Sequence, residues 1–548
     1  MYDCIDGLVD DEQAIYKRGG TAYKSNSDVT APLRGAWHAR LAVGQRTMFW
    51  NSADLFYLDP SDAATVETYL AIPPPKGYRR MVEVGGLVAY VPDAGGGPYI
   101  WGGSEFPVYN TGTASATEGS RTVTGVGTAW NSNAQQGMIL GALGNYMAVV
   151  DQVVSNTQLE LTAPWAQASV AGGVYSLTPY QQLGLFSSAV PLGLQAEELY
   201  LTAVGTPPRL IQAVGNRLYF NLSGQVGNQQ NLDYHEVPGT TLGVDAIRDN
   251  VIWFTDSGVY VVGNMNLDLV DADGNTQQTL QRISQDIILW DDAGIVGLST
   301  YAGLVGWRGE LIVPARDDIY IMGVDGPPVA ISRGIRSLYR SYVAAGYRLG
   351  IASFDEGHYF LPVRNGDTIV DTLVCRIDQR DSRGNLRPAW TRLGSGVRCA
   401  GFAVRSVPPT GSVLVGAKGA RLLDLSALRV PTAARKNDAD GTGFNLDVTT
   451  NDLETPAKST LQRVRLHYDL VDAASDNPTI SASYAVDAQE GAALTGLSGT
   501  AGETTTTPKV WQVVKRGRAF RLRFLSSGPS SRLRLRALDW FLRDSDRP

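Results

Sequence analysis

Basic residues near the C-terminus form the most distinctive chemical pattern of the chain. Between residues 521 and 536, arginines alternate with leucine or phenylalanine in the segments RLRF and RLRLR. Successive side chains of a β-strand point to opposite faces of its sheet, so this spacing predicts strands with one apolar and one cationic face. We call the following residues the arginine ribbon: Lys515, Arg516, Arg518, Arg521, Arg523, Arg532, Arg534 and Arg536. Such a ribbon can dock onto an acidic protein surface or contact phosphate. The alternative is that the arginines solvate the outer face of a sandwich and pair with carboxylates of the same chain.

A second basic cluster lies in the segment SRGIRSLYR, at Arg333, Arg336 and Arg340. Residues three, four and seven positions apart share one side of an α-helix, so the spacing is compatible with a short cationic helix. An exposed loop is the alternative. In either case the cluster is a second candidate for a subunit or phosphate contact.

The residue types that usually carry catalysis or metal binding are sparse and poorly spaced. The four histidines show no metal-ligand spacing, and a zinc-like motif that starts at His235 has Gly239 where its second histidine would stand. The segment Gly411–Lys418 resembles a phosphate-binding loop, but Ala417 separates the second glycine from the lysine. No G-x-S-x-G nucleophile motif occurs. We therefore expect no catalytic residue, no metal site and no cofactor, and we predict that the chain is not an enzyme.

Cysteine usage and hydropathy bear on the compartment. Cys4, Cys375 and Cys399 are odd in number and far apart, which predicts reduced, buried thiols. No apolar run approaches the roughly 18–20 residues that span a bilayer. The first residues also lack the basic and apolar pattern of a signal peptide. These features predict a protein that is made and folded in a cytoplasm and does not span a membrane.

Charge is distributed unevenly along the chain. The whole chain carries −7, and residues 511–548 hold ten basic and three acidic residues, which leaves −14 for residues 1–510. An acidic body argues against a general nucleic-acid binder. It also offers an acidic surface on which the arginine ribbon of a neighbouring copy can dock.

A repeated two-strand phrase indicates the fold. In residues 244–262, two runs of β-branched and aromatic residues flank a polar turn at Asp256–Gly258, which predicts a β-hairpin. The same phrase recurs at residues 48–59, 87–103, 310–323, 358–378 and 412–425. Six or seven such units, spaced by roughly 40–60 residues, are typical of the blades of a β-propeller. A pair of β-sandwiches is the alternative.

Two further segments differ in texture from the repeats. Residues 108–179 are rich in Thr, Ser, Gly and Ala and lack the aromatic phrase, which predicts a small inserted β-domain in a surface loop. After a polar linker at 431–445, strands alternate with period two and predict an antiparallel C-terminal β-sandwich. The predicted all-β organisation is therefore an N-terminal lead-in and first blades (1–107), the inserted domain (108–179), the remaining blades (180–430) and the sandwich (431–548). Within the lead-in, residues 14–24 predict a strand, a Gly-Gly turn and a second strand.

Several segments together resemble the tail hub or nozzle proteins of short-tailed bacteriophages, which include packaged-DNA stabilisation and tail tubular proteins. The phrase IYKRGGTAYKSN (Ile15–Asn26) is similar to the entry phrase of that family, although Arg18-Gly19-Gly20 stands where the family usually has Arg-Pro-Gly. Leu33–Asp59 looks like its first blade, and residues 513–524 (VVKRGRAFRLRF) resemble the final strands of its C-terminal sandwich. The insert looks like a small β-module that is common in phage tail and virion proteins.

The resemblance implies a structural virion protein without catalytic residues. Its expected assembly is a homo-hexameric ring below the portal and adaptor, in contact with other tail proteins. Such a ring forms part of the DNA conduit, retains the genome and releases it on infection, while double-stranded DNA passes without sequence-specific contacts. The expected location is the virion tail, after assembly in the host bacterial cytoplasm. The alternatives are a carbohydrate-active propeller enzyme and a receptor-binding propeller module.

Overall fold

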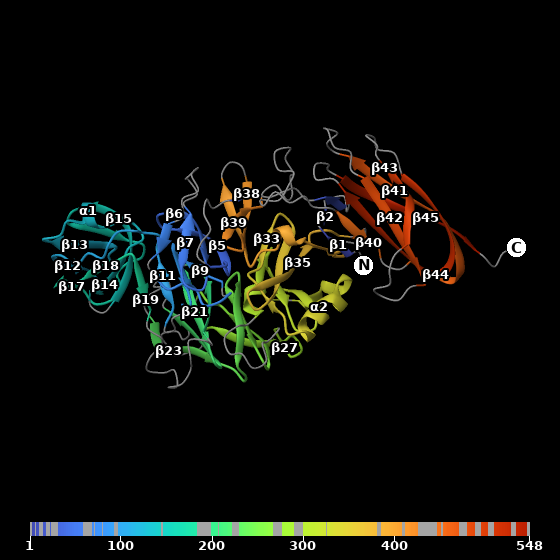
Figure 1. The fold of residues 1–548 in the computed structure, drawn as a ribbon. Helices are drawn as coiled ribbons and strands as arrows, with labels where there is room; N and C mark the ends of the chain where they lie inside the picture. The colour runs from blue at the N-terminus through green and yellow to red at the C-terminus, as the bar shows by residue number, and fades with distance from the viewer. Residues whose placement is uncertain are drawn as a thin grey trace. The chain divides into compact units, whose positions relative to one another are not determined.

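The computed structural model divides the chain into two compact units. We call residues 31–330 the central unit, and residues 1–30 with 331–548 the terminal unit. The structure describes residues 3–5, 7–9, 15–17, 22–23, 31–58, 68–70, 72–78, 80–92, 97–143, 146–183, 199–206, 208–221, 229–266, 277–289, 300–324, 326–380, 385–407, 411–425, 446–450, 453–470, 479–487, 495–501, 509–527 and 533–544. Strands dominate this described part (Figure 1). The predicted domain boundaries remain predictions.

The central unit contains five successive four-stranded antiparallel sheets, each of which is a blade. In four of them, strands that are neighbours along the chain are neighbours in the sheet, and in the second blade an insertion separates β11 from its sheet neighbour β19. The first two blades consist of β5 (Gly35–Leu41), β6 (Gly44–Trp50), β7 (Leu55–Leu58), β8 (Thr68–Leu70), β9 (Val82–Val84), β10 (Leu87–Tyr90), β11 (Tyr99–Trp101) and β19 (Tyr180–Gln182). The next two consist of β20 (Leu199–Val204), β21 (Arg209–Val214), β22 (Arg217–Asn221), β23 (Gln229–Glu236), β24 (Thr241–Ile247), β25 (Asn250–Thr255), β26 (Gly258–Gly263) and β27 (Thr279–Ser284). The fifth consists of β28 (Val305–Trp307), β29 (Glu310–Pro314), β30 (Ile319–Met322) and β31 (Val329–Ala330).

Each repeated phrase of the sequence forms the second and third strands of a blade. In the fourth blade, β25 and β26 pair in register from Thr255 opposite Gly258 to Val251 opposite Val262, around the expected turn. Gly258 has a φ of +141°, a conformation that suits glycine and explains its place in this turn. The sequence of residues 208–222 shows only one clear strand, whereas the structure has two there, β21 and β22. The prediction of an all-β propeller is confirmed by this strand order.

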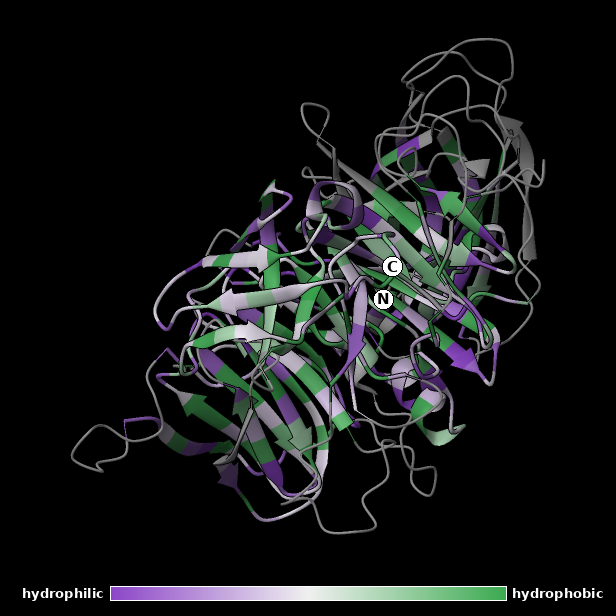
Figure 2. Cartoon of the chain, turned by 90° about the vertical axis from the view of Figure 1, so that its left-hand side faces the viewer, coloured by the Kyte–Doolittle hydropathy of each residue, from purple (hydrophilic) through white to green (hydrophobic). Residues whose placement is uncertain are grey.

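Apolar side chains between successive blades form the core of the central unit. One cluster of buried residues spans β20 to β30, and a second joins β9 and β10 to β20 and β21. Aromatic pairs contribute, such as Tyr57 of β7 and Trp101 of β11, whose ring centroids are 5.4 Å apart. Figure 2 shows these hydrophobic residues in green, mainly on the strands.

A buried arginine links the first strands of several blades. Arg80 precedes β9, and its guanidinium lies 2.8 Å from the carboxylate of Asp245 on β24. It also donates hydrogen bonds to the carbonyl oxygens of Val244 and of Leu304, which precedes β28. Thr202 of β20 donates to the same Asp245 carboxylate at 3.4 Å. Four consecutive blades are thus tied together by one polar network at their first strands.

The predicted inserted β-domain lies between the third and fourth strands of the second blade. Its seven-stranded sheet has a core of its own, which includes Trp130 and Trp165. Gly137 and Gly102 bring the insert and the blade into direct backbone contact, and a Cβ on either glycine would overlap the carbonyl of the other. The elements of the insert are β12 (Thr113–Ala116), β13 (Thr122–Val126), α1 (Trp130–Asn133), β14 (Ile139–Leu143), β15 (Tyr146–Ser155), β16 (Gln158–Leu161), β17 (Val170–Gly173) and β18 (Ser176–Thr178).

The terminal unit contains two further blades. In the last blade, β4 from the N-terminal segment forms the fourth strand, so residues remote in sequence complete one sheet. These blades consist of β32 (Arg348–Leu349), β33 (Ser353–Asp355), β34 (His358–Asn365), β35 (Thr368–Arg376), β36 (Ala389–Arg392), β37 (Phe402–Val407), β38 (Gly411–Lys418), β39 (Arg421–Asp424) and β4 (Ala22–Tyr23). The described residues therefore form seven blades, in agreement with the expected six or seven.

A continuous sheet joins the sixth blade to the predicted C-terminal β-sandwich. The short strand β1 (Asp3–Ile5) pairs with β36 on one side and with β40 (Asp447–Thr449) on the other. The remaining strands of the sheet are β2 (Gly7–Val9), β3 (Ile15–Lys17), β41 (Leu453–Leu470), β42 (Thr479–Val486), β43 (Thr495–Ala501), β44 (Lys509–Ser527) and β45 (Leu533–Asp544). The strands expected at residues 14–24 are present, but β3 pairs with β2 and β45 while β4 pairs with β39. They therefore do not form a hairpin with each other.

Candidate functional site

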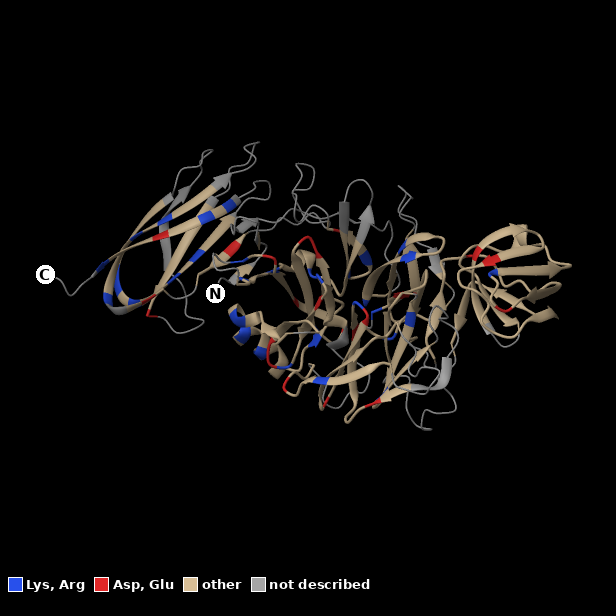
Figure 3. Cartoon of the chain, turned by 180° about the vertical axis from the view of Figure 1, so that it is seen from behind, with Lys and Arg blue, Asp and Glu red and all other residues tan. Residues whose placement is uncertain are grey.

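The arginine ribbon begins on β44, where apolar and cationic residues alternate as the spacing implies. Phe520, Leu522 and Phe524 are buried in the sandwich core, while Arg521 is half-buried and Arg523 is exposed. The alternation in VWQVV (510–514) and AFRLRFL (519–525) predicts two separate strands, whereas the structure has one strand of 19 residues, Lys509–Ser527. Basic residues, blue in Figure 3, lie along the strands of this sandwich.

Arg523 is bound within its own chain. Its guanidinium donates two hydrogen bonds to the carboxylate of Asp447 on β40, at 2.8 and 2.5 Å. This is the bidentate arrangement in which arginine holds a carboxylate most specifically. Arg523 therefore follows the alternative interpretation, in which an arginine of the ribbon pairs with a carboxylate of the same chain.

A break in the pairing of β44 with β41 precedes the ribbon's first members. The register shifts near Val514, which has a φ of +48°. Lys515, Arg516 and Arg518 follow this β-bulge with exposed side chains. The backbone N–H of Arg518 donates to the exposed Asp487, and such bonds from the backbone lower the pKa of that carboxyl group.

The second half of the ribbon lies on β45. Arg534 is half-buried, and its backbone is paired in register with that of Asp469 on β41, whereas Arg536 is exposed. The register shifts between His467 and Tyr468, so Arg536 has no residue directly opposite on β41. Arg532 lies outside the described residues.

A cationic row on β41 escaped the sequence analysis. Arg463, Arg465 and His467 alternate with buried residues, and the carboxylate of Asp539 accepts a 2.7 Å hydrogen bond from His467. The guanidinium of Arg463 lies 4.0 Å from the ring centroid of Phe541. The alternation in TLQRVRLHYDL was a signal for this row, because it predicts the strand and hence one polar face.

The second basic cluster lies on helix α2 (Arg336–Ala344) and the turn before it. Arg336 and Arg340 are exposed on the helix, and Arg333, which is also exposed, lies in the preceding 3₁₀ turn. The structure therefore contains the short helix and not the exposed loop. Tyr339 and Tyr342 of the helix are buried. Figure 3 shows these basic residues along α2.

A buried carboxylate anchors α2 to its blade. Asp371 of β35 is fully buried and accepts hydrogen bonds from the hydroxyl of Tyr342 at 2.5 Å and from Arg392 at 2.6 Å. Arg398 lies 3.8 Å from its other oxygen. Burial and the neighbouring Asp371 raise the pKa of Tyr342. The tyrosine therefore stays protonated as a donor, and the network is a structural support.

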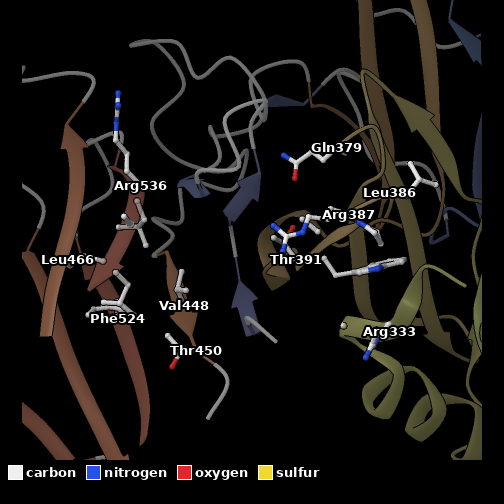
Figure 4. A pocket seen from close by; sticks show the side chains of 17 residues that line it. Arg333, Gln379, Leu386, Arg387, Thr391, Val448, Thr450, Leu466, Phe524 and Arg536 are labelled. Carbon is white, nitrogen blue, oxygen red and sulfur yellow. The ribbon is translucent and has the colours of Figure 1, made fainter. Parts of the chain in front are cut away.

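A groove of about 520 Å³ in the terminal unit brings one member of each basic cluster together. Arg333 and Arg536 line it with Arg387, which neither sequence pattern included. Figure 4 shows Val448 and Phe524 of the sandwich on one side and Arg387 with Arg333 on the other. Among the described residues that line the groove there is no aspartate or glutamate. Of the cationic candidates that the structure describes, the others are not among its lining residues.

The described residues contain no group of three or more histidine, cysteine or acidic side chains that could hold a metal ion. The three cysteines are buried and are not joined in disulfides, which confirms the predicted thiols. Within the described ranges, no helix is long and apolar enough to cross a bilayer.

Comparison with known proteins assigns no family. No protein-family model and no curated protein matches the chain. Among solved structures, the extracellular domain of the one-component system BT4673 from B. thetaiotaomicron matches with a TM-score of 0.37 and 9% identity. That match covers 94% of this chain, and the chain spans 62% of that domain. BamB from Moraxella catarrhalis matches with a TM-score of 0.31 and 10% identity, over 77% of this chain and 97% of BamB. Strand order, and not these likenesses, establishes the propeller fold.

Proposed function

We propose that this chain is a structural subunit of a bacteriophage tail, a hub or nozzle protein that forms part of the DNA conduit. Six copies would form a ring below the portal and adaptor, which retains the packaged genome and releases it on infection. The observation that supports this role is the exposed cationic face of β44, on a chain whose first 510 residues carry −14. Subunits with opposite charges on different surfaces can associate head to tail, and such contacts close into rings.

The Arg80 network supports a conduit between copies. The first strands of four blades of the central unit are tied together by buried side chains around Arg80 and Asp245. These buried contacts hold the first strands together, so the proposal does not place the path of the DNA between them. In the proposed ring, DNA passes along a lumen formed by several subunits. An acidic lumen would repel phosphate and let the duplex slide.

The proposal is tested by reversing charges on β44. Lys515 and Arg518 have exposed side chains, so Lys515→Glu with Arg518→Glu should leave the monomer folded. Arg523 is unsuitable, because reversing it would also break its ion pair with Asp447. The matched control is Arg308→Glu with Arg316→Glu, two exposed residues of the central unit that give the same change in net charge.

Ring formation is then followed by mass measurement with the purified portal, adaptor and other tail proteins. We expect the control to form rings as the wild type does and the β44 variant to remain monomeric with an unchanged circular dichroism spectrum. Normal rings from the β44 variant would contradict the role assigned to this face. A wild-type chain that stays monomeric with these partners and cleaves polysaccharide would replace the proposal with the enzyme alternative.

A further inference from the structure

The exposed side of helix α2 consists of arginine and small residues. All nine residues of the helix are described, and the exposed ones are Arg336, Ser337, Arg340, Ser341 and Ala344. Arg336 and Arg340 are four positions apart, so they share one side of the helix and are separated by about 6 Å along its axis. Arg333 is exposed in the 3₁₀ turn before the helix. The second basic cluster is therefore one exposed cationic surface, blue in Figure 3.

The sequence around α2 concentrates positive charge in an acidic chain. Residues 326–354 contain four arginines and no aspartate or glutamate, whereas the whole chain carries −7. The positive charge of this surface is therefore a property of one continuous segment. A negatively charged partner would be attracted to it.

Contacts on the buried side hold the helix in place. The hydroxyl of Tyr342 donates to the buried carboxylate of Asp371 at 2.5 Å, and Tyr339 is fully buried. The indole N–H of Trp390 donates a 2.8 Å hydrogen bond to the carbonyl of Ile331, just before the 3₁₀ turn. The arginines therefore extend from a fixed helix, so binding must order their side chains but not their backbone, and the entropy cost of binding is lower.

The exposed residue types favour a phosphate backbone over other acidic partners. The core of a protein interface is usually built from aromatic and large apolar residues, and an interfacial membrane helix inserts such residues among the lipids. None of the five exposed residues of α2 is large and apolar. Arginine and serine side chains, by contrast, are ordinary contacts to phosphate oxygens. Because duplex DNA carries one charge per roughly 1.7 Å of its axis, arginines spaced by about 6 Å can all meet phosphates at once.

We propose that the exposed side of α2 binds the phosphate backbone of double-stranded DNA through Arg333, Arg336 and Arg340, without reading the base sequence. The choice of partner rests on the proposed conduit function and adds a contact that attracts the genome. Phosphate contacts of this kind allow a protein to slide along DNA. In the proposed ring, α2 therefore helps to retain the packaged duplex without blocking its release.

The test uses a short fluorescein-labelled DNA duplex of arbitrary sequence, titrated with the full chain and followed by fluorescence anisotropy at several salt concentrations. Three phosphate contacts predict that the logarithm of the binding constant falls with the logarithm of the salt concentration with a slope of about −3. Arg336→Gln with Arg340→Gln should reduce the steepness of this slope by about 2. At roughly 50 mM salt, binding should weaken by about tenfold for each arginine.

Two control variants separate the charge of α2 from its fold and from net charge. Arg336→Lys with Arg340→Lys keeps both charges and should retain nearly the wild-type slope. Arg308→Gln with Arg316→Gln changes the net charge of the chain equally at two exposed residues of the central unit and should bind as the wild type does. Equal slopes for the wild type and the α2 glutamine variant, or no DNA binding by the folded chain, would overturn the inference. So would displacement of the duplex by polyglutamate of equal charge with the same dependence on Arg336 and Arg340, since an acidic protein would then be the partner.

Ring assembly with the purified tail proteins is measured separately on the same variants. The α2 glutamine variant should form normal rings, because the basic residues of β44 are unchanged. Rings of normal mass from a wild-type chain that does not bind DNA would overturn this inference and leave the hub role standing. DNA binding that depends on the α2 arginines, in a chain that forms no rings, would support this inference and contradict the proposed hub.

Discussion

Replacement of the buried arginine of the central unit should destabilise several blades together. Arg80→Met keeps most of the side-chain volume but removes the charge that faces Asp245, whose side chain is only 13% exposed. It also removes the donors to the carbonyls of Val244 and Leu304. Breaking one side of a buried ion pair costs about 3–5 kcal/mol, because the remaining charge is left without compensation. For a unit of this size, the thermal midpoint should fall by about 6–15 °C.

Calorimetry and urea unfolding of the full chain measure this effect, and a double-mutant cycle separates the pair from the rest. Asp245→Asn keeps an acceptor for Thr202 and removes the stranded charge, so adding it to Arg80→Met should recover about 2 kcal/mol. The exposed control Arg316→Met should change stability by less than about 0.5 kcal/mol. A cost below about 1 kcal/mol for Arg80→Met, or strict additivity of the two substitutions, would refute the reasoning.

Three further substitutions test other parts of the structure. Asp371→Asn removes the buried charge that two arginines and a tyrosine share, so it should lower stability to urea by about 2–4 kcal/mol and increase hydrogen exchange in α2. Gly137→Ala should lower the thermal midpoint more than Gly119→Ala does, because both have a positive φ but only Gly137 abuts the backbone of Gly102; equal shifts would exclude the close contact as the cause. Burial lowers the pKa of His235, so the unfolded chain binds this proton more readily. Stability should therefore fall as pH drops through about 6.5, and urea midpoints of His235→Gln should decline less; parallel curves would assign the pH effect to other groups.

The blades were predictable because their information is local. A run of β-branched and aromatic residues, a turn such as Asp256–Gly258 and a second run together encode a hairpin without reference to the rest of the chain. Partners at long sequence separation were not predictable. The three residues of β1 carry too little pattern to reveal that they join the sixth blade to the sandwich. For the same reason, the two strands expected within residues 14–24 were predicted, but their distant partners, β45 and β39, were not.

In the candidate site, too, local patterns were predictable and contacts between distant segments were not. The alternation around Arg521 and Arg523 placed arginines on the polar face of β44, because period two is a property of one strand. Arg523 and Asp447, which form an ion pair, are 76 positions apart, and the sequence around neither residue indicates this contact. Arg80 follows another arginine, a pattern that is typical of exposed residues, although packing between blades buries it. Arg387 acquires its place in the groove only when the blade and the sandwich share one sheet.

Electron microscopy of purified virions, with this chain labelled and viewed along the tail axis, tests the central claim most directly. The account predicts a closed ring of six labelled copies around the DNA path, below the portal and adaptor. Absence of the label from the tail, or single copies at the tips of tail fibres, would contradict it.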